Sequence, residues 1–138
     1  MKTFYDYEAH GSIVPYRGLV AYKLVMFNDA TKQHQSTTTM TTRVNYSKEK
    51  AAVAPKGTFL FCYPEAIKLW CWPDEFWKVM ILGEKWITTA KIEVPIPALW
   101  GHFWDPQPDP TYDRSRIATI PLGPGIIFAE KVRLLHRI

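Results

Sequence analysis

A chain of 138 residues with 47% apolar and 22% charged residues has the size and balance of one compact globular domain, which excludes a disordered chain. Its apolar runs are too short for a membrane-spanning helix, and its first residues lack the apolar core of a signal peptide, so we expect a cytoplasmic protein. Two cysteines exclude a disulfide framework, and a net charge of +4 without a dense Lys and Arg cluster argues against duplex DNA as a partner.

The first third of the chain predicts two strands after a short amino-terminal arm. The arm, residues 1–16, is aromatic and polar without clear periodicity, and a short strand that ends at Pro15 is the alternative prediction. Residues 18–27 are rich in strand-forming side chains, which indicates a buried strand, and residues 28–31 then form a turn. Residues 37–44 contain five threonines and predict a more exposed edge strand.

The middle of the chain predicts a strand followed by a short helix. Residues 47–56 are typical of a solvated loop or a short helix, and residues 57–62 form a compact apolar strand. A proline and then a glutamate open residues 64–70, which is typical of the first turn of a helix. Residues 76–82 fit a helix or a strand equally well, and Gly83 is expected to end them.

The last third predicts two strands separated by a stiff loop. Residues 85–96 are rich in β-branched side chains, whereas five prolines make residues 95–111 an extended loop. A tight turn over residues 121–125 precedes a final strand over residues 126–138. Together the elements predict an α+β fold: a single compact domain, residues 1–138, with a mixed, mostly antiparallel sheet and one or two short helices.

All six tryptophans lie between residues 70 and 104. Those that belong to predicted strands and helices are candidates for the core, and we favour this interpretation for the aromatic residues of 57–94. Trp100 and Trp104 lie instead on the proline-rich loop together with Phe103. Exposed aromatic side chains on a stiff loop commonly anchor an interface.

Arginines and aromatic residues accompany this loop and the first strand. Guanidinium groups bind phosphates and aromatic faces stack on bases, so the set suits a nucleotide, a cyclic oligonucleotide or a single strand. A surface residue after a turn is the alternative interpretation of Arg17. The residues that we assign to ligand or partner binding are Arg17, Arg43, Trp100, Phe103, Trp104, Tyr112, Arg114 and Arg116.

Two short motifs suggest an enzymatic alternative. Tyr16-Arg17-Gly18 at the start of the first strand and Ser36-Thr37-Thr38 further on resemble the arginine-serine-glutamate class of ADP-ribosyltransferases. The resemblance implies that Arg17 holds the nicotinamide dinucleotide NAD, that Ser36 lies on a neighbouring strand, and that Glu93 or Glu130 completes the site. The Glu-x-Glu or Gln-x-Glu signature of that family is missing from this chain, so we favour a non-catalytic protein.

Potential metal ligands occur without the spacing of a known site. Cys62, Cys71 and His102 with Asp105 or His136 offer suitable atoms, but no C-x-x-C or H-x-x-x-H pattern joins them. We therefore predict no metal and no cofactor, and place both cysteines in the core.

The sequence thus predicts a non-catalytic binding module. By type, the chain resembles accessory proteins of phages and mobile elements that sequester or inhibit a host component, as in anti-defence. The expected partner is a nucleotide-like anionic small molecule or a host protein, with no membrane, and exposed strand edges suggest a homodimer. The alternative function is an ADP-ribosyltransferase-like enzyme that uses NAD.

Overall fold

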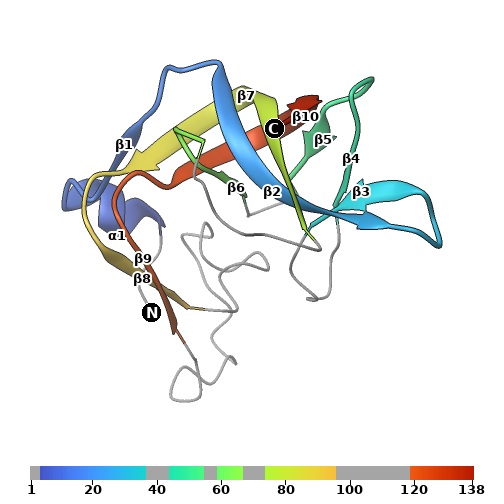
Figure 1. Ribbon diagram of the computed structural model, residues 1–138. Coiled ribbons are helices and arrows are strands. Elements are labelled where there is room, and N and C mark those ends of the chain that lie inside the picture. Colours follow the sequence, from blue (N-terminus) through green and yellow to red (C-terminus); the bar gives the residue numbers. More distant parts are fainter. Residues whose placement is uncertain (1–3, 37–43, 55–58, 67–73, 96–118) are drawn as a thin grey trace.

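Ten strands and one short helix make up the part of the chain that the computed structural model describes, residues 4–36, 44–54, 59–66, 74–95 and 119–138 (Figure 1). In chain order the elements are α1 (Phe4–Ala9), β1 (Ile13–Pro15), β2 (Val20–Asn28), β3 (Gln33–Gln35), β4 (Asn45–Tyr46), β5 (Ala52–Val53), β6 (Leu60–Cys62), β7 (Glu75–Thr88), β8 (Ile92–Pro95), β9 (Thr119–Leu122) and β10 (Ile127–Arg137). None of the described residues forms a helix with the length and apolar content that a bilayer crossing requires.

Three long antiparallel strands, β2, β7 and β10, form the centre of the fold. Buried and less buried side chains alternate along much of their length, because successive side chains of a strand point to opposite faces of the sheet. Val79 of β7 pairs with Ala21 of β2 on one side and with Leu134 of β10 on the other. The order of strands across the sheet is β4, β3, β2, β7, β10, β5.

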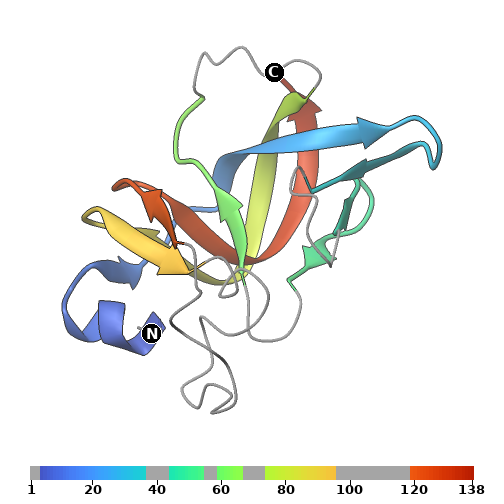
Figure 2. The ribbon, with the colours of Figure 1, turned by 90° about the horizontal axis from the view of Figure 1, so that it is seen from below.

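The sheet curls until its two flanks meet, which gives a nearly closed barrel (Figure 2). β6 pairs with the first half of β10, and Tyr63, directly after β6, exchanges two backbone hydrogen bonds of 2.8 Å with Tyr22 of β2. At the other half of β10, the N–H group of Leu134 donates to the carbonyl of Ser47, which follows β4, at 2.9 Å. Closure satisfies backbone groups that open strand edges would leave unpaired.

One apolar cluster fills the barrel interior. Its members lie on the inward faces of the strands and include Val25, Val79, Ile81, Ile127 and Val132, none of which is exposed to solvent. Burial of such side chains contributes roughly 1.5–3 kcal/mol each to folding. The long strands therefore form because their inward faces share one core.

A second apolar cluster lies outside the barrel, where α1, β1 and the β8–β9 ribbon cover one side of it (Figure 2). Tyr7, Ile13 and Ile92 are buried there against Phe128 of β10. Phe61 contacts the Phe128 ring edge-on, with 4.9 Å between the ring centroids. The amino-terminal arm is thus held on the barrel by apolar packing.

The predicted α+β class is wrong, because the described structure is almost entirely β. Pro64 to Ala66, where we expected a helix to begin, form no helix, and Tyr63 just before them forms an isolated antiparallel bridge with Tyr22 of β2. The rest of that predicted helix, residues 67–70, lies outside the described residues. The one described helix, α1, falls instead in the arm.

The other expectations from the sequence have mixed outcomes. β2, the turn after it and β10 confirm the strands and the turn predicted there. Gly83 does not end its element, since β7 runs through it at a bulge where its φ of 75° suits glycine. The strand predicted over residues 85–96 is wrong, because its described part is divided between the end of β7 at Thr88 and β8 from Ile92 to Pro95. The threonine-rich segment 37–43 and most of the loop 95–111 lie outside the described residues.

Candidate functional site

One end of the barrel brings together aromatic rings, a histidine and charged groups from several elements. Their positions follow from strand register: Phe27 of β2 pairs with His34 of β3, and Glu75 of β7 pairs with Val25 of β2, so these side chains share the inward face. We call this set the barrel-end cluster. Its members are Phe27, His34, Lys48, Glu75, Trp77 and Arg137.

Glu75 is the polar centre of the barrel-end cluster. One carboxylate oxygen, Oε1, accepts a hydrogen bond from Trp77 Nε1 at 2.9 Å and lies 3.1 Å from His34 Nε2. The other oxygen lies 3.6 Å from a guanidinium nitrogen of Arg137. Burial alone would raise the pKa of Glu75, but Trp77, Arg137 and His34 outweigh it, and the pKa lies below its ordinary value. Glu75 is therefore a carboxylate at neutral pH.

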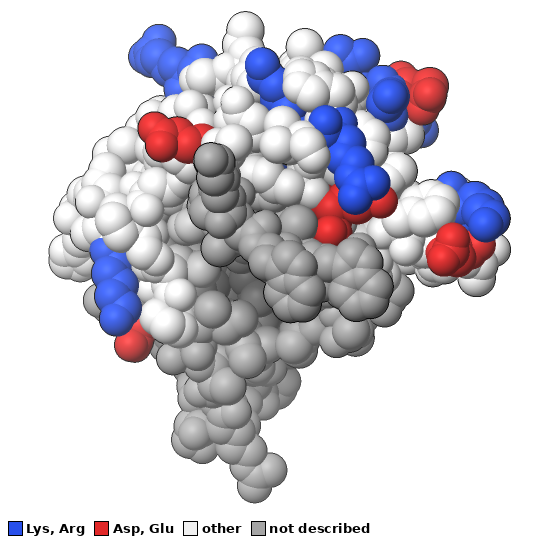
Figure 3. Space-filling view, viewed as in Figure 1, with Lys and Arg blue, Asp and Glu red and all other residues white. Residues whose placement is uncertain are grey.

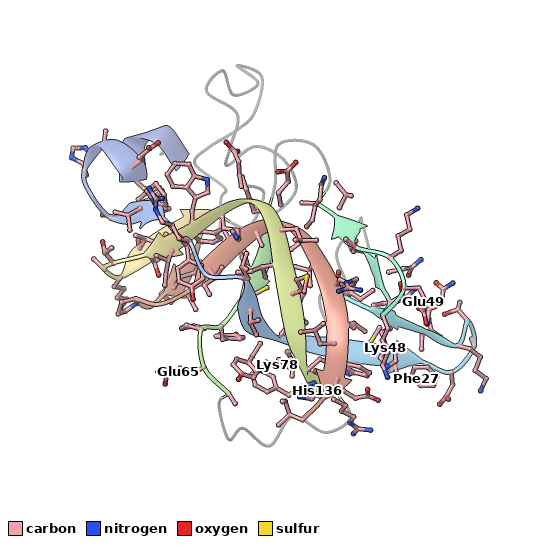
Figure 4. The ribbon with its side chains drawn as sticks, turned by 90° about the horizontal axis from the view of Figure 1, so that it is seen from above. Phe27, Lys48, Glu49, Glu65, Lys78 and His136 are labelled. Carbon is pink, nitrogen blue, oxygen red and sulfur yellow. The ribbon has the colours of Figure 1, made fainter. Side chains whose placement is uncertain are left out.

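The aromatic side chains of the cluster form a continuous row. The His34 ring lies between Trp77, edge-on at 5.0 Å between centroids, and Phe27 at 5.1 Å. Lys48 Nζ lies 5.6 Å from the centre of the Trp77 ring, within the range of a cation–π contact. Trp77 is buried, whereas Phe27 is 38% exposed and the Arg137 side chain is 61% exposed. Figure 4 shows Phe27 and Lys48 beside the end of β10. A ligand can reach the outer end of the row.

The cluster lacks the arrangement of a covalent catalyst. A carboxylate that orients a histidine is one part of a catalytic triad, but a nucleophile must hydrogen-bond to the histidine as well. Among the described residues, no hydroxyl or thiol group does so, and Ser36 Oγ, two positions after His34 in sequence, accepts a hydrogen bond from the N–H group of Val44.

Deeper in the barrel, Lys23 is a buried cation on β2. Its Nζ donates to the carbonyl oxygen of Phe61 at 2.6 Å and lies 5.3 Å from the centre of the Tyr46 ring. Burial alone would lower the pKa of Lys23, but Tyr46 and Cys62 raise it, and the pKa lies above its ordinary value. Burial raises the pKa of the Cys62 thiol to about 11, with Lys23 opposing that rise. Lys23 is thus charged, and Cys62 is an unreactive thiol.

Most of the binding residues predicted from the sequence lie outside the described residues. These are Arg43, Trp100, Phe103, Trp104, Tyr112, Arg114 and Arg116. Arg17 is described and lies exposed in the connection between β1 and β2. A side chain at Gly18 would meet the Tyr16 ring at 2.6 Å, so this glycine has a packing role of its own.

The structure does not bring together the residues that the ADP-ribosyltransferase resemblance implies. Arg17 precedes β2, whereas Ser36 follows Gln35, which pairs with Met26 near the far end of that strand. Glu93 is exposed on β8, and Glu130 Oε2 accepts a hydrogen bond from the backbone N–H group of Glu84. These groups occupy separate parts of the described structure.

The described residues contain no group of three or more metal-ligating side chains. Cys62 is buried in the barrel, and His136 is exposed near the end of β10. Cys71, His102 and Asp105 lie outside the described residues.

Comparisons with known proteins returned no relative: no protein-family model matches the chain, nor does any curated protein or solved structure. The sequence analysis missed the barrel-end cluster entirely. One signal was available, because Phe27 and His34 flank the predicted turn and a hairpin there pairs them. The contribution of Glu75, Trp77 and Arg137 depends on long-range pairing that no local pattern reveals.

Proposed function

We propose that this chain is a non-catalytic binding module that holds a nucleotide-type anion at the barrel-end cluster. The observation that carries the proposal is the ring pair of Phe27 and His34 beside two exposed cations, Lys48 and Arg137. Sequestration of such a ligand, as accessory proteins of phages and mobile elements do, is the biological role that we propose.

Each part of the cluster suits one part of a nucleotide. The exposed Phe27 ring offers a face on which a base can stack, which is worth roughly 1–3 kcal/mol per base. The Arg137 guanidinium and the Lys48 ammonium suit phosphate oxygens, the first through paired N–H donors and the second as a point charge. Glu75 orients Arg137 and His34 through its two carboxylate oxygens.

The charge of the cluster favours a small anion. Lys48 and Arg137 contribute +2 and Glu75 contributes −1, which leaves +1 with His34 neutral. Duplex DNA needs many phosphate contacts at once, whereas a single nucleotide needs few. The cluster therefore fits a mononucleotide or a short single strand better than a duplex.

Isothermal titration calorimetry with ATP, adenosine and pyrophosphate tests the proposal. We expect ATP to bind more tightly than either fragment, because only ATP combines a base with phosphates. Phe27→Ala should weaken ATP and adenosine binding about tenfold and leave pyrophosphate binding unchanged. Lys48→Ala should weaken ATP and pyrophosphate binding.

Lys50→Ala is the matched control for Lys48→Ala. Lys50 is exposed on the same segment as Lys48, and its substitution by alanine removes the same charge. No contact of the Lys50 side chain with Trp77 is present among the described residues. The ATP affinity of the Lys50→Ala variant should equal that of the wild type. Equal losses in both lysine variants would mean that only net charge attracts the anion, and the proposed site would be wrong.

A further inference from the structure

The outward face of the central sheet combines apolar and cationic side chains. Because Ala21, Val79, Ile81 and Val132 face the barrel core, the residues next to them in sequence point outward. Met80 of β7 pairs with Val20 of β2 on one side and with Arg133 of β10 on the other. On the same face, Leu82 pairs with Lys131, and Lys78 pairs with His136. We call Val20, Lys78, Met80, Leu82, Lys131 and Arg133 the outer sheet face.

The outer sheet face is partly open to solvent. Val20 is 36% exposed, and the other five side chains are half-buried. In Figure 3, Lys and Arg atoms lie among uncharged atoms over the top of the molecule, and Asp or Glu atoms adjoin them at the upper right. Figure 4 shows Lys78 and His136 near the ends of their adjacent strands.

The cations of this face have no carboxylate partner among the residues that the structure describes. Within the described ranges, the groups that Arg133 reaches are neutral: the Met80 sulfur at 3.6 Å and the Lys48 carbonyl oxygen at 3.5 Å. Glu130 lies next to Lys131 in sequence, but its carboxylate binds the backbone of Glu84 at the bulge. Positive charge interspersed with apolar side chains is therefore available to a partner.

We propose that the outer sheet face docks a protein segment that presents carboxylates alternating with apolar side chains. Carboxylates would pair with Lys78, Lys131 and Arg133, while the apolar side chains would cover Met80 and Leu82. A second copy of this chain is disfavoured, because two-fold pairing would bring one positively charged face against another. A nucleic acid is disfavoured as well, because Met80 and Leu82, beside Arg133 and Lys131, offer no aromatic face. The Tyr22 ring beside Lys78 already stacks on Phe76.

Methyl NMR spectroscopy of the full chain with defined peptides tests this docking surface. The probe is a peptide of alternating Glu and Leu, compared with a Glu and Ser peptide, a Lys and Leu peptide and a short oligothymidine. We expect the Glu and Leu peptide alone to shift the Met80 and Leu82 methyl signals saturably. Lys131→Glu should weaken its binding about tenfold or more.

Lys50→Glu is the control for the charge reversal, since Lys50 is exposed outside the outer sheet face. It should leave peptide binding near the wild-type value. Absence of shifts at Met80 and Leu82, equal binding of the Glu and Ser peptide, or equal shifts with oligothymidine would overturn the proposal. The ATP affinity of Lys131→Glu, measured alongside, should equal that of the wild type. Loss of peptide binding in this variant then tests the outer sheet face separately from the barrel-end cluster.

Sedimentation experiments test whether the chain associates with itself as its concentration rises. If it does, and if Lys131→Glu abolishes the association, the outer sheet face binds a second copy of the chain. That result would also overturn the proposal. We expect no self-association through this face at the concentrations used for NMR.

Discussion

The His34 imidazole and the Glu75 carboxylate meet at 3.1 Å although they are 41 positions apart in sequence and β2 lies between their strands. The contact is possible because the sheet curls, so that inward-facing side chains of β3 and β7 converge across β2. Trp77 and Arg137 complete the surroundings of the carboxylate. The same curvature that closes the barrel thus builds the barrel-end cluster.

Glu75 should stabilise the fold at neutral pH and lose this contribution in acid. Its native pKa lies below the ordinary value of about 4.3, so its stabilisation is complete above that pH and declines as the pH falls toward the native pKa. Glu75→Gln should reduce the free energy of unfolding at pH 7 by about 1–2 kcal/mol. Urea unfolding at pH 7 and at lower pH measures both effects.

The free energy of unfolding of Glu75→Gln should also depend less on pH in the acid range than that of the wild type does. Glu49→Gln is the control, because Glu49 is exposed and should change neither quantity. An unchanged stability of Glu75→Gln at pH 7 would show that the hydrogen bonds to this carboxylate contribute nothing.

Gly83→Ala should destabilise the protein by about 1–3 kcal/mol. Gly83 has a φ of 75°, and an added Cβ would lie 2.4 Å from Glu130 Oε2, the atom that binds the backbone of Glu84. Gly123→Ala is the matched control, since nothing lies within 4 Å of its Cβ position. Thermal melts of the two variants should differ clearly, and similar melting temperatures would contradict the bulge geometry.

The sequence predicted two of the three long strands, β2 and β10, better than β7 or the class of the fold. Residues 18–27 and 126–138 have dense strand-forming side chains, and their packing in one core agrees with that local preference. Pro64 and Glu65 look like a helix start, but Tyr63 just before them forms an isolated antiparallel bridge with Tyr22, which is distant in sequence. Gly83 looks like a strand end because a bulge cannot be distinguished from a break without knowledge of β10.

The site was less predictable than the strands, because it too depends on pairing between residues that are distant in sequence. The arginine and tryptophan set proposed from the sequence rested on local composition, and Arg17 is its one member among the described residues. The barrel-end cluster combines residues from β2, β3, β7 and β10 through register and curvature. Its polar centre, Glu75, carries no motif.

The Cys62 thiol should resist alkylation in the native protein. Burial raises its pKa to about 11, so at pH 8 almost none of it is the reactive thiolate. In a Cys71→Ser background, labelling by iodoacetamide should proceed only as fast as the barrel opens and should accelerate in urea. Labelling at the rate of a free thiol in buffer would contradict the closed barrel around β6.

The most direct measurement of the central claim is an NMR titration of the native chain with ATP that follows the His34 imidazole and Phe27 ring signals. If the barrel-end cluster holds a nucleotide, both rings should shift saturably with one dissociation constant, and Phe27→Ala should raise that constant about tenfold. Ring signals of His34 and Phe27 that do not move while ATP binds elsewhere, or that do not move at all, would contradict the account.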